Sequence, residues 1–572
     1  MWNFNVRLRS YSFLFLFLIS SFGFAQTESL YLKNQTPEYK EVIEFYQKLD
    51  KEYASAKLIS YPETDAGLAL QLFVIDSKQE FRPNKERAMI LIMNGIHGGE
   101  LCGVDASMNL ALNLLKNGTI PENCMIGIIP VYNIGGALNR NSTSRANQNG
   151  PEEYGFRGNA KNLDLNRDFI KNDSKNAFAF SQIYHEWKPE IYVDTHTSNG
   201  ADYQYPFTLI STQKDKLSPV LKPFLTDKIE PYLYKGMSKK GFIMTPYVNS
   251  IKETPNDGIA GFLDRPRYST GYTALFNTIG FTTEAHMFKP FKTRVRATLA
   301  FLELIVNFTN TNAAEIVRYK RMADRMMVNT LYYDVDWALN DSINHSIEFK
   351  GYEAAYKTSE ISGSQRLYYD RTKPFTDSIQ FYDTYRSIMK VKRPKYYIIP
   401  KAWDEVIVRL KSNKVTMKAL TNDTLIRVKV FYIADYSTTT APYEGHYLHS
   451  KVSIVEKVDT LRFHKGDLIV SMGQLSDNYC VSVLDPRGAD SFFAWNFFDP
   501  ILQQKEYFSS YVFEDEAVEI LNSDPLLKKD FNKKKASDQS FREDPYAQLN
   551  YIYHHSSHYE KGHLRYPIFR VD

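Results

Sequence analysis

Apolar and polar residues up to about residue 310 follow two different spacings. Residues 38–53, 100–118 and 293–308 carry apolar side chains at helical spacing. Between these stretches lie runs that are apolar almost throughout, as strands covered on both faces must be. The runs span 87–94, 124–133, 190–196 and 278–284. Strands that alternate with helices predict an α/β fold with a mixed, mostly parallel sheet and helices on both faces.

The pattern changes after about residue 310. A helical stretch at 313–327 leads into many short, Tyr-rich segments in which apolar and polar residues alternate, which indicates a β-rich region. A chain of 572 residues is too long for one ordinary core. We therefore expect an α/β domain over 26–332 and a β-rich C-terminal accessory domain over 333–572. The charged segment 526–539 is expected on the surface.

The N-terminus has the layout of a secretory signal peptide. Basic residues precede an apolar stretch from Phe13 to Phe24, and small residues favour cleavage after Ala25, so residues 1–25 form the expected signal. The apolar stretch is too short to span a bilayer comfortably, and nothing later in the chain is long enough. We expect an exported protein, periplasmic or secreted, without stable membrane insertion.

Charge and cysteine content argue against two classes of protein. A net charge of +4 gives no electrostatic reason to expect nucleic-acid binding. Three cysteines are too few for a disulfide framework. Cys102 and Cys124 could pair if the helix start and the strand start that carry them lie close together. Buried thiols are the other interpretation.

Three of the predicted strands lead into side chains that can bind a metal or carry a proton. His97 follows the first strand, His196 ends the third, and Glu284 ends the fourth. Open α/β sheets place their sites at the carboxyl ends of the strands, so these residues are expected to meet at one edge. The alternative for "HGGE" (97–100) is a tight turn that happens to contain two polar residues.

His97, Glu100 and His196 are suited to a catalytic zinc ion. They would supply two imidazoles and one carboxylate and leave one position open for water. The two glycines between His97 and Glu100 would let the backbone turn sharply, so that both side chains face one ion. Zinc lowers the pKa of a bound water from about 15.7 to about 7, which suits hydrolysis at neutral pH.

Other histidine motifs lack this context. The His-x-x-Glu spacing recurs at His345–Glu348, but in a strand-like segment, where positions three apart point to opposite faces. Two further stretches, 445–450 and 554–563, are rich in histidine but have no partner carboxylates at strand ends. We interpret all three as unrelated to the zinc site.

Four motifs, in order along the chain, resemble the zinc metallocarboxypeptidases of the carboxypeptidase A type. They are "HGGE" with His97 and Glu100, "NLDLNRDF" (162–169), "DTH" with His196, and "TTE" with Glu284. The resemblance covers about residues 37–310. It implies that 26–332 is a catalytic domain that binds one Zn²⁺ ion through the three residues named above and takes peptides as substrates.

The resemblance also implies roles for the residues around the ion. Asp164 resembles the carboxylate that orients the first histidine ligand through its free ring N–H. Asn166 and Arg167 resemble the pair that holds the terminal carboxylate of the substrate. Glu284 resembles the general base, which takes a proton from water and passes it to the leaving amine.

Two further roles stay open between neighbouring residues. Arg157 is preferred as the residue that stabilises the oxyanion, with Arg145 second; Arg140 is a further candidate. Arg145 is otherwise assigned to substrate binding. The family's mobile tyrosine corresponds to Tyr268 or Tyr272.

Three functions compete on this basis. The preferred one is an exported zinc metallopeptidase that hydrolyses the C-terminal peptide bond of peptides. The first alternative is a zinc amidohydrolase acting on N-acyl amino acids or peptidoglycan stem peptides, because such enzymes also carry His-x-x-Glu and an Asn-Arg pair. The second is a peptide- or glycan-binding protein with a decayed catalytic domain. The sequence indicates neither side-chain specificity nor oligomeric state.

Overall fold

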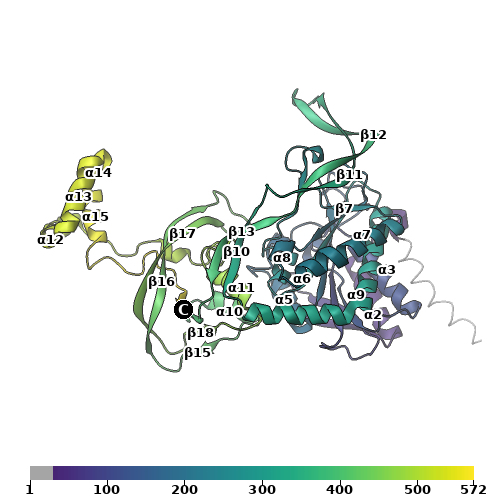
Figure 1. The fold of residues 1–572 in the computed structure, drawn as a ribbon, viewed down its shortest axis with the longest axis horizontal. Coiled ribbons are helices and arrows are strands. Elements are labelled where there is room, and N and C mark those ends of the chain that lie inside the picture. The colour runs from purple at the N-terminus through teal and green to yellow at the C-terminus, as the bar shows by residue number, and fades with distance from the viewer. Residues whose placement is uncertain (1–29) are drawn as a thin grey trace, which may run out of the picture.

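The structure is a computed structural model that describes residues 30–572, and its first half is built around one eight-stranded sheet (Figure 1). Four central strands are parallel, whereas β2 and β6 run antiparallel to their central neighbours. The strand order across the sheet is β1 (Ala56–Glu63), β2 (Ala69–Ile75), β4 (Cys124–Ile129), β3 (Ala88–Met93), β5 (Ile191–Ser198), β9 (Ile279–His286), β6 (Phe207–Ser211) and β7 (Met244–Pro246).

Helices cover both faces of this sheet, which confirms the predicted α/β fold. One face packs against α2 (Tyr39–Glu52), α3 (Cys102–Lys116), α6 (Leu221–Phe224), α7 (Glu230–Lys239) and α9 (Phe291–Val328). The other face packs against α5 (Lys175–Trp187) and α8 (Ser269–Ala274). A short helix, α4 (Ile134–Leu138), follows β4.

Strand β3 shows why the central strands read as unbroken apolar runs. All six of its residues are buried. Ile90 and Ile92 belong to the core under α3 and α9, whereas Met89 and Leu91 belong to the core under α5. Because alternate side chains of a strand point to opposite faces, a strand covered on both faces needs apolar residues at every position.

Helix α9 differs from its prediction. The sequence indicates two helices, 293–308 and 313–327, but the structure has one helix of 38 residues with a non-helical backbone at Asn312. The Asn312 side chain donates to the Phe308 carbonyl at 2.8 Å. A local hydrogen bond of this kind competes with the helical pattern without ending the helix.

The C-terminal half is β-rich, as predicted. Two strands, β10 (Tyr332–Leu339) and β13 (Tyr385–Lys392), form a ribbon. The largest sheet of this half has the order β15 (Lys418–Ala419), β18 (Leu468–Ser471), β14 (Tyr396–Ile399), β19 (Phe569–Val571), β16 (Thr424–Thr438) and β17 (His449–Phe463). Two helices pack here, α10 (Asp404–Ser412) and α11 (Asp477–Leu484).

The two halves of the chain share structure. A long hairpin of β11 (His345–Thr358) and β12 (Gln365–Tyr382) pairs with β8 (Ile259–Ala260) of the first half and projects from the body (Figure 1). The core under α5 also continues into the C-terminal half, where the ring of Phe276 stacks on Tyr479 at 5.9 Å. The domain boundary after residue 332 stays a prediction.

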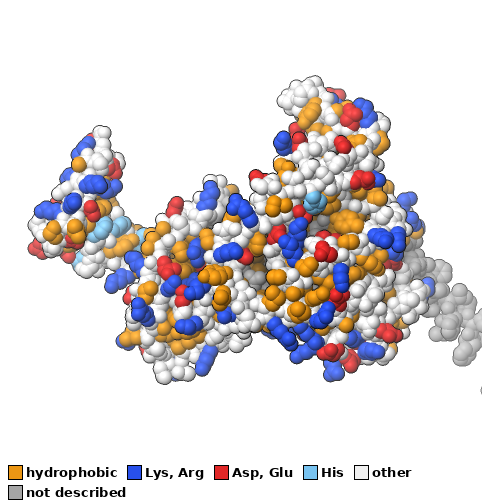
Figure 2. All heavy atoms as spheres, viewed as in Figure 1, with side chains coloured by type: hydrophobic (Ala, Val, Ile, Leu, Met, Phe, Trp, Pro, Cys, Tyr) orange, Lys and Arg blue, Asp and Glu red, His pale blue; other side chains and the backbone are white. Residues whose placement is uncertain are grey.

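Four helices near the C-terminus form a small module with its own core. Figures 1 and 2 show it standing clear of the main body. The helices are α12 (Ser510–Ser523), α13 (Pro525–Ser537), α14 (Gln539–Glu543) and α15 (Pro545–His554). Asp524, Asp538 and Asp544 cap the last three by accepting backbone N–H groups. The charged segment expected on the surface is therefore largely a capped helix, α13.

Two of the three expectations about cysteines, the signal peptide and the membrane can be compared with the described residues. Cys102, Cys124 and Cys480 are all buried and unpaired, so Cys102 and Cys124 form no disulfide. The expected signal peptide, 1–25, lies outside the described residues. Within 30–572, no helix is long and apolar enough to cross a membrane.

Asp105 in α3 predicts a pH-dependent stability. The side chain is buried, and burial raises its pKa from 3.8 to about 7, although Thr36 donates to its Oδ2 at 2.6 Å. The folded state therefore binds more protons than the unfolded state between these pH values, and stability falls as pH rises towards 7. We predict that Asp105→Asn stabilises the protein at pH 8, by up to ~4 kcal/mol at ~1.4 kcal/mol per pKa unit, and changes little at pH 4.

Urea unfolding at pH 4 and pH 8 measures this effect. Asparagine stays neutral and can still accept the Thr36 hydrogen bond. Asp341→Asn, at an exposed position, is the matched control and should behave like the wild type at both pH values. An equal change for Asp105→Asn at both pH values would contradict the prediction.

Candidate metal centre

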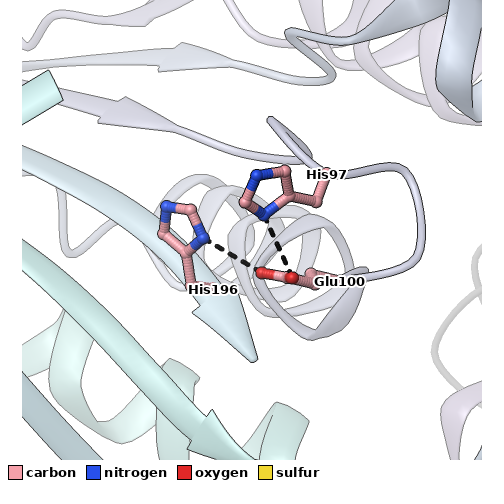
Figure 3. A group of neighbouring side chains, drawn as sticks. All are labelled: His97, Glu100 and His196. Carbon is pink, nitrogen blue, oxygen red and sulfur yellow. Dashed lines mark hydrogen bonds and ion pairs between the residues drawn. The ribbon is translucent and has the colours of Figure 1, made fainter. Parts of the chain in front are cut away.

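Three buried side chains meet at the carboxyl edge of the sheet (Figure 3). One ligand atom each from His97, Glu100 and His196 lies within 4.8 Å of the others. Nδ1 of His97 lies 3.0 Å from Oε1 of Glu100, and Nδ1 of His196 lies 3.0 Å from Oε2. His97 and Glu100 come from the loop between β3 and α3, whereas His196 lies on β5. The structure thus brings together residues about a hundred positions apart.

The loop of His97 and Glu100 requires its two glycines because other chain segments lie close. A Cβ atom on Gly98 would lie 2.6 Å from the Phe156 carbonyl oxygen, and one on Gly99 would lie 2.5 Å from Nε of Arg145. Neither glycine has a positive φ angle. The sequence predicts a sharp turn here, and the structure has one, since the Glu100 N–H donates to the His97 carbonyl at 2.9 Å. Close packing is a second reason for the glycines.

A carboxylate lies beside the second ring nitrogen, Nε2, of each histidine. Nε2 of His97 lies 3.0 Å from Oδ1 of Asp164. Nε2 of His196 lies 3.1 Å from Oδ2 of Asp194, within ion-pair distance but off the line of a hydrogen bond. Both rings are thus oriented with Nδ1 towards Glu100, an arrangement typical of metal-binding histidines.

The charges of this cluster are strongly coupled. Burial acts to raise the pKa of Glu100, but His97 and Arg145 outweigh it and hold this pKa well below its usual range. Burial acts to lower the pKa of His196, but the carboxylates of Asp194 and Glu100 raise it well above 6.5. Desolvation opposes ionisation of Asp164 as well, and the hydrogen bond with His97 lowers its pKa nevertheless. Each group is therefore stabilised in its charged form by its neighbours.

Glu284 lies beside this cluster on β9. Strand β9 pairs in parallel with β5, and Glu284 is the register partner of His196. Burial raises the pKa of Glu284 to about 8, the carboxylates of Glu100 and Asp194 add to this rise, and His196 opposes it. A carboxyl group with a raised pKa at a cleft is suited to exchanging a proton near neutral pH.

Two of the three candidate arginines lie at the cluster. Arg145 donates to Oε1 of Glu100 through Nη2, and to Gln148 through Nη1 at 2.7 Å. Arg157 donates to Oδ2 of Asp164 through Nε at 3.1 Å and Nη2 at 2.8 Å. Arg140 lies elsewhere and donates to backbone carbonyls, including that of Thr36.

Asn166 and Arg167 follow Asp164 in a short 3-10 helix, Leu165–Arg167. The Asp164 side chain caps this turn by accepting from the Asn166 N–H at 2.9 Å. The Arg167 guanidinium lies 4.6 Å from the ring centre of Tyr268. Asn166 and Arg167 both line the cavity described next.

Apart from Asp164, Asp194 and Arg140, the groups described above line one cavity of about 620 Å³. Its lining includes His97, Glu100, Arg145, Arg157, Asn166, Arg167, His196, Tyr247, Phe262, Tyr268, Thr282 and Glu284. Tyr268 is thus in the cleft. Tyr272, the other candidate, is fully buried and donates to Asn413 at 2.6 Å, outside the cavity.

Sequence reasoning missed Asp194. The signal was present, because Asp194 and His196 are two apart on β5 and so point to the same face of the strand. The histidine motifs at 345–348, 445–450 and 554–563 form no group of metal-binding geometry in the described part of the chain. Among the described residues, the set of His97, Glu100 and His196 alone has the geometry of a metal site.

Fold and site together define an α/β protein with a candidate hydrolytic metal centre. The family model described as zinc carboxypeptidase matches residues 42–260. This match confirms, for that part of the chain, the metallocarboxypeptidase family indicated by the motifs. It ends before β9, so Glu284 lies beyond the matched region.

The chain is similar, at low sequence identity, to several solved structures. A metallo-carboxypeptidase from Burkholderia cenocepacia is 14% identical, with 48% of this chain and 70% of that chain covered and a TM-score of 0.37. Carboxypeptidase A from Helicoverpa armigera is 12% identical, with 53% and 81% covered and a TM-score of 0.37. Similarity at this sequence identity and TM-score supports no conclusion about activity. A search of curated proteins found no match.

Proposed function

We propose that the protein is an exported zinc carboxypeptidase that removes C-terminal residues from peptides. The observation that supports this most is the shared cavity. It holds three possible metal ligands, a carboxyl group with a raised pKa, and Arg167, whose Nη2 donates to none of the described residues. These are the parts that hydrolysis of a terminal peptide bond requires.

The donor set fits one zinc ion. Two imidazole nitrogens and one carboxylate are a ligand set used by catalytic zinc, and they leave a position open. Asp164 and Asp194 orient the two rings, which supports metal binding rather than a purely structural ion pair. When bound there, zinc would polarise the substrate carbonyl and make a coordinated water more acidic.

The chain's own residues would then divide the reaction between them. Glu284 takes the proton of the attacking water and passes it to the leaving amine. A guanidinium stabilises the developing oxyanion, a role for which we retain Arg157 before Arg145. Arg145 donates directly to the metal ligand Glu100, whereas Arg157 pairs with Asp164 and is the more exposed of the two. Arg157 is half-exposed at the cavity and can turn towards a substrate.

Arg167 is proposed to bind the terminal carboxylate, with Asn166 beside it. Its Nη1 donates to the Asn166 carbonyl at 2.8 Å, and its face rests on Tyr268. Among the described residues, no hydrogen bond uses its Nη2. A guanidinium whose Nη2 has no hydrogen-bond partner can donate to a carboxylate. Such an anchor restricts cleavage to the end of a chain.

Asp164 provides a prediction about metal binding. Asp164→Asn should weaken zinc binding by about 10- to 100-fold, because the amide orients the His97 ring less well and increases its basicity less. Competition with a chromophoric chelator measures the affinity. Asp377→Asn, at an exposed position of the hairpin, is the control and should bind zinc like the wild type. Equal affinities for Asp164→Asn and the wild type would contradict the role of Asp164.

Release of amino acids from a mixed peptide set tests the function. We expect free C-terminal residues from peptides with a free carboxylate, none from the same peptides with a C-terminal amide, and no release after chelation. Failure to release any terminal residue from zinc-loaded protein would refute the proposal. Secretion is tested separately, by locating the protein in cell fractions and sequencing its mature N-terminus.

The same cavity suits a second substrate class. N-acyl amino acids and peptidoglycan stem peptides also carry a carboxylate close to the scissile amide, which Arg167 could hold. Adding them to the panel separates these cases by relative kcat/KM. The third reading, a decayed enzyme that only binds, predicts purified protein without zinc and without turnover of any substrate in the panel.

A further inference from the structure

A loop of the C-terminal half contacts two residues of the candidate site, Arg167 and Asp164. Residues 439–448 join β16 to β17. In Figure 1 these two strands lie well away from α3, the helix that follows Glu100. The hydroxyl of Tyr443 in this loop accepts a hydrogen bond from Nε of Arg167 at 2.9 Å. The neighbouring Glu444 accepts from the backbone N–H of Asp164 at 2.7 Å. One loop thus touches both Arg167 and the residue that orients His97.

The loop is held firmly in this position. Tyr443 stacks on Trp495, with ring centres 6.0 Å apart and planes 15° apart. At the other end of the turn, Nε2 of His446 lies 2.7 Å from Oδ2 of Asp173 in the first half. Glu444 adopts a left-handed backbone with φ of 50°, a conformation that costs a non-glycine residue energy. Such a conformation persists only where the surrounding contacts determine it.

Arg267 stabilises the aromatic base of the loop. Its guanidinium lies 5.0 Å from the ring centre of Trp495 and 5.8 Å from that of Tyr443. Asp490 pairs with it at 2.7 Å. The hydroxyl of Tyr443 also interacts with Arg267, and the stacking on Trp495 is the contact of the ring that does not involve the hydroxyl.

We propose that Tyr443 is a positioning residue that orients Arg167 for the substrate's terminal carboxylate. The C-terminal half would then complete the substrate site, an inference that rests on the proposed function. Nε of Arg167 is held by Tyr443, Nη1 by the Asn166 carbonyl, and the guanidinium face by Tyr268. These three contacts fix the plane of the guanidinium, and Arg167 lines the cavity. A guanidinium held in this way loses less conformational freedom when it binds a carboxylate.

The variant Tyr443→Phe isolates this role, because phenylalanine keeps the ring against Trp495 and removes only the hydroxyl. KM for peptides with a free C-terminal carboxylate should rise about 5- to 20-fold, while kcat stays within about twofold. This rise is smaller than that for losing a direct hydrogen bond to a charged group, because Tyr443 acts on the carboxylate only through Arg167. Tyr447→Phe is the matched control. Tyr447 lies in the same loop, is exposed, and should give wild-type constants.

Direct binding supplies a second readout that does not need turnover. N-acetylphenylalanine and its amide are titrated into wild type, Tyr443→Phe and Tyr447→Phe, with ligand-observed NMR. The acid should bind Tyr443→Phe about 5- to 20-fold more weakly than wild type, and the amide should bind all three proteins equally.

Each outcome bears on the inference. Constants for Tyr443→Phe within twofold of wild type overturn it, as does an equal loss for acid and amide, which would mean a general effect on the fold. Failure of the wild type to bind the acid overturns it too. If the wild type releases no terminal residue yet binds the acid in a Tyr443-dependent way, the proposed function fails and the positioning role stands.

Discussion

Replacing Glu284 with glutamine is expected to lower kcat by about 10²- to 10⁴-fold, the usual contribution of a general acid–base group. Glutamine has the shape of glutamate but cannot take a proton from water. Glu284 contributes none of the three atoms of the metal group, so zinc content should stay at one ion per chain. KM should change little, because the carboxylate anchor at Arg167 is untouched. Steady-state release of a C-terminal residue, together with metal analysis, measures both quantities.

A half-buried glutamate away from the cleft serves as the control for this experiment. Glu190 precedes β5, accepts the Met89 N–H at 2.8 Å, and has a pKa raised to about 7 by burial. Glu190→Gln should retain activity, because it changes a half-buried carboxyl group without touching the cavity. Retained activity in Glu284→Gln would refute the assignment of the base, whatever the result for Glu190.

Loss of a metal ligand should be the most severe change. His196→Ala removes one of three donors, and we expect activity to fall by about 10⁴-fold or more, since both the polarised carbonyl and the acidic water depend on the ion. Zinc should be lost on dialysis, in contrast to Glu284→Gln. A chelator should reproduce the loss in the wild type, and added zinc should restore the wild type but not His196→Ala.

The chance copy of the motif provides the matched control. His345 belongs to the second His-x-x-Glu, on β11, where His345 and Glu348 are both exposed. His345→Ala should keep full zinc content and full activity. Zinc bound tightly by His196→Ala, with wild-type turnover, would contradict the assigned ligand set.

These two predictions follow from features that local sequence determines. A run such as 87–94 is apolar at every position because β3 is covered on both faces, so its burial and strand character are readable without coordinates. Parallel strands present their carboxyl ends at one edge, which is why His97, His196 and Glu284 could be expected to meet. The order of the motifs indicated the zinc metallocarboxypeptidase family, and the family-model match confirms it for residues 42–260.

Other features depended on contacts that no local pattern contains. Tyr268 and Tyr272 are four apart with similar neighbours, yet one lines the cleft and the other is buried against Asn413. Arg145 contacts Glu100 and Arg140 does not, although both lie in the loop that follows α4. In each pair the outcome depends on which distant segment packs against the residue.

The sequence by itself determined the α/β class, the β-rich second half and the residues that converge on the candidate metal centre, because strand burial and strand ends are local properties. Only the tertiary structure decided that the glycines of "HGGE" allow close packing, that Asp194 lies behind His196, and that Tyr443 reaches Arg167. Tyr443 and Arg167 are 276 positions apart. A hydrogen bond over such a separation exists only once two packed halves of the chain bring its partners together.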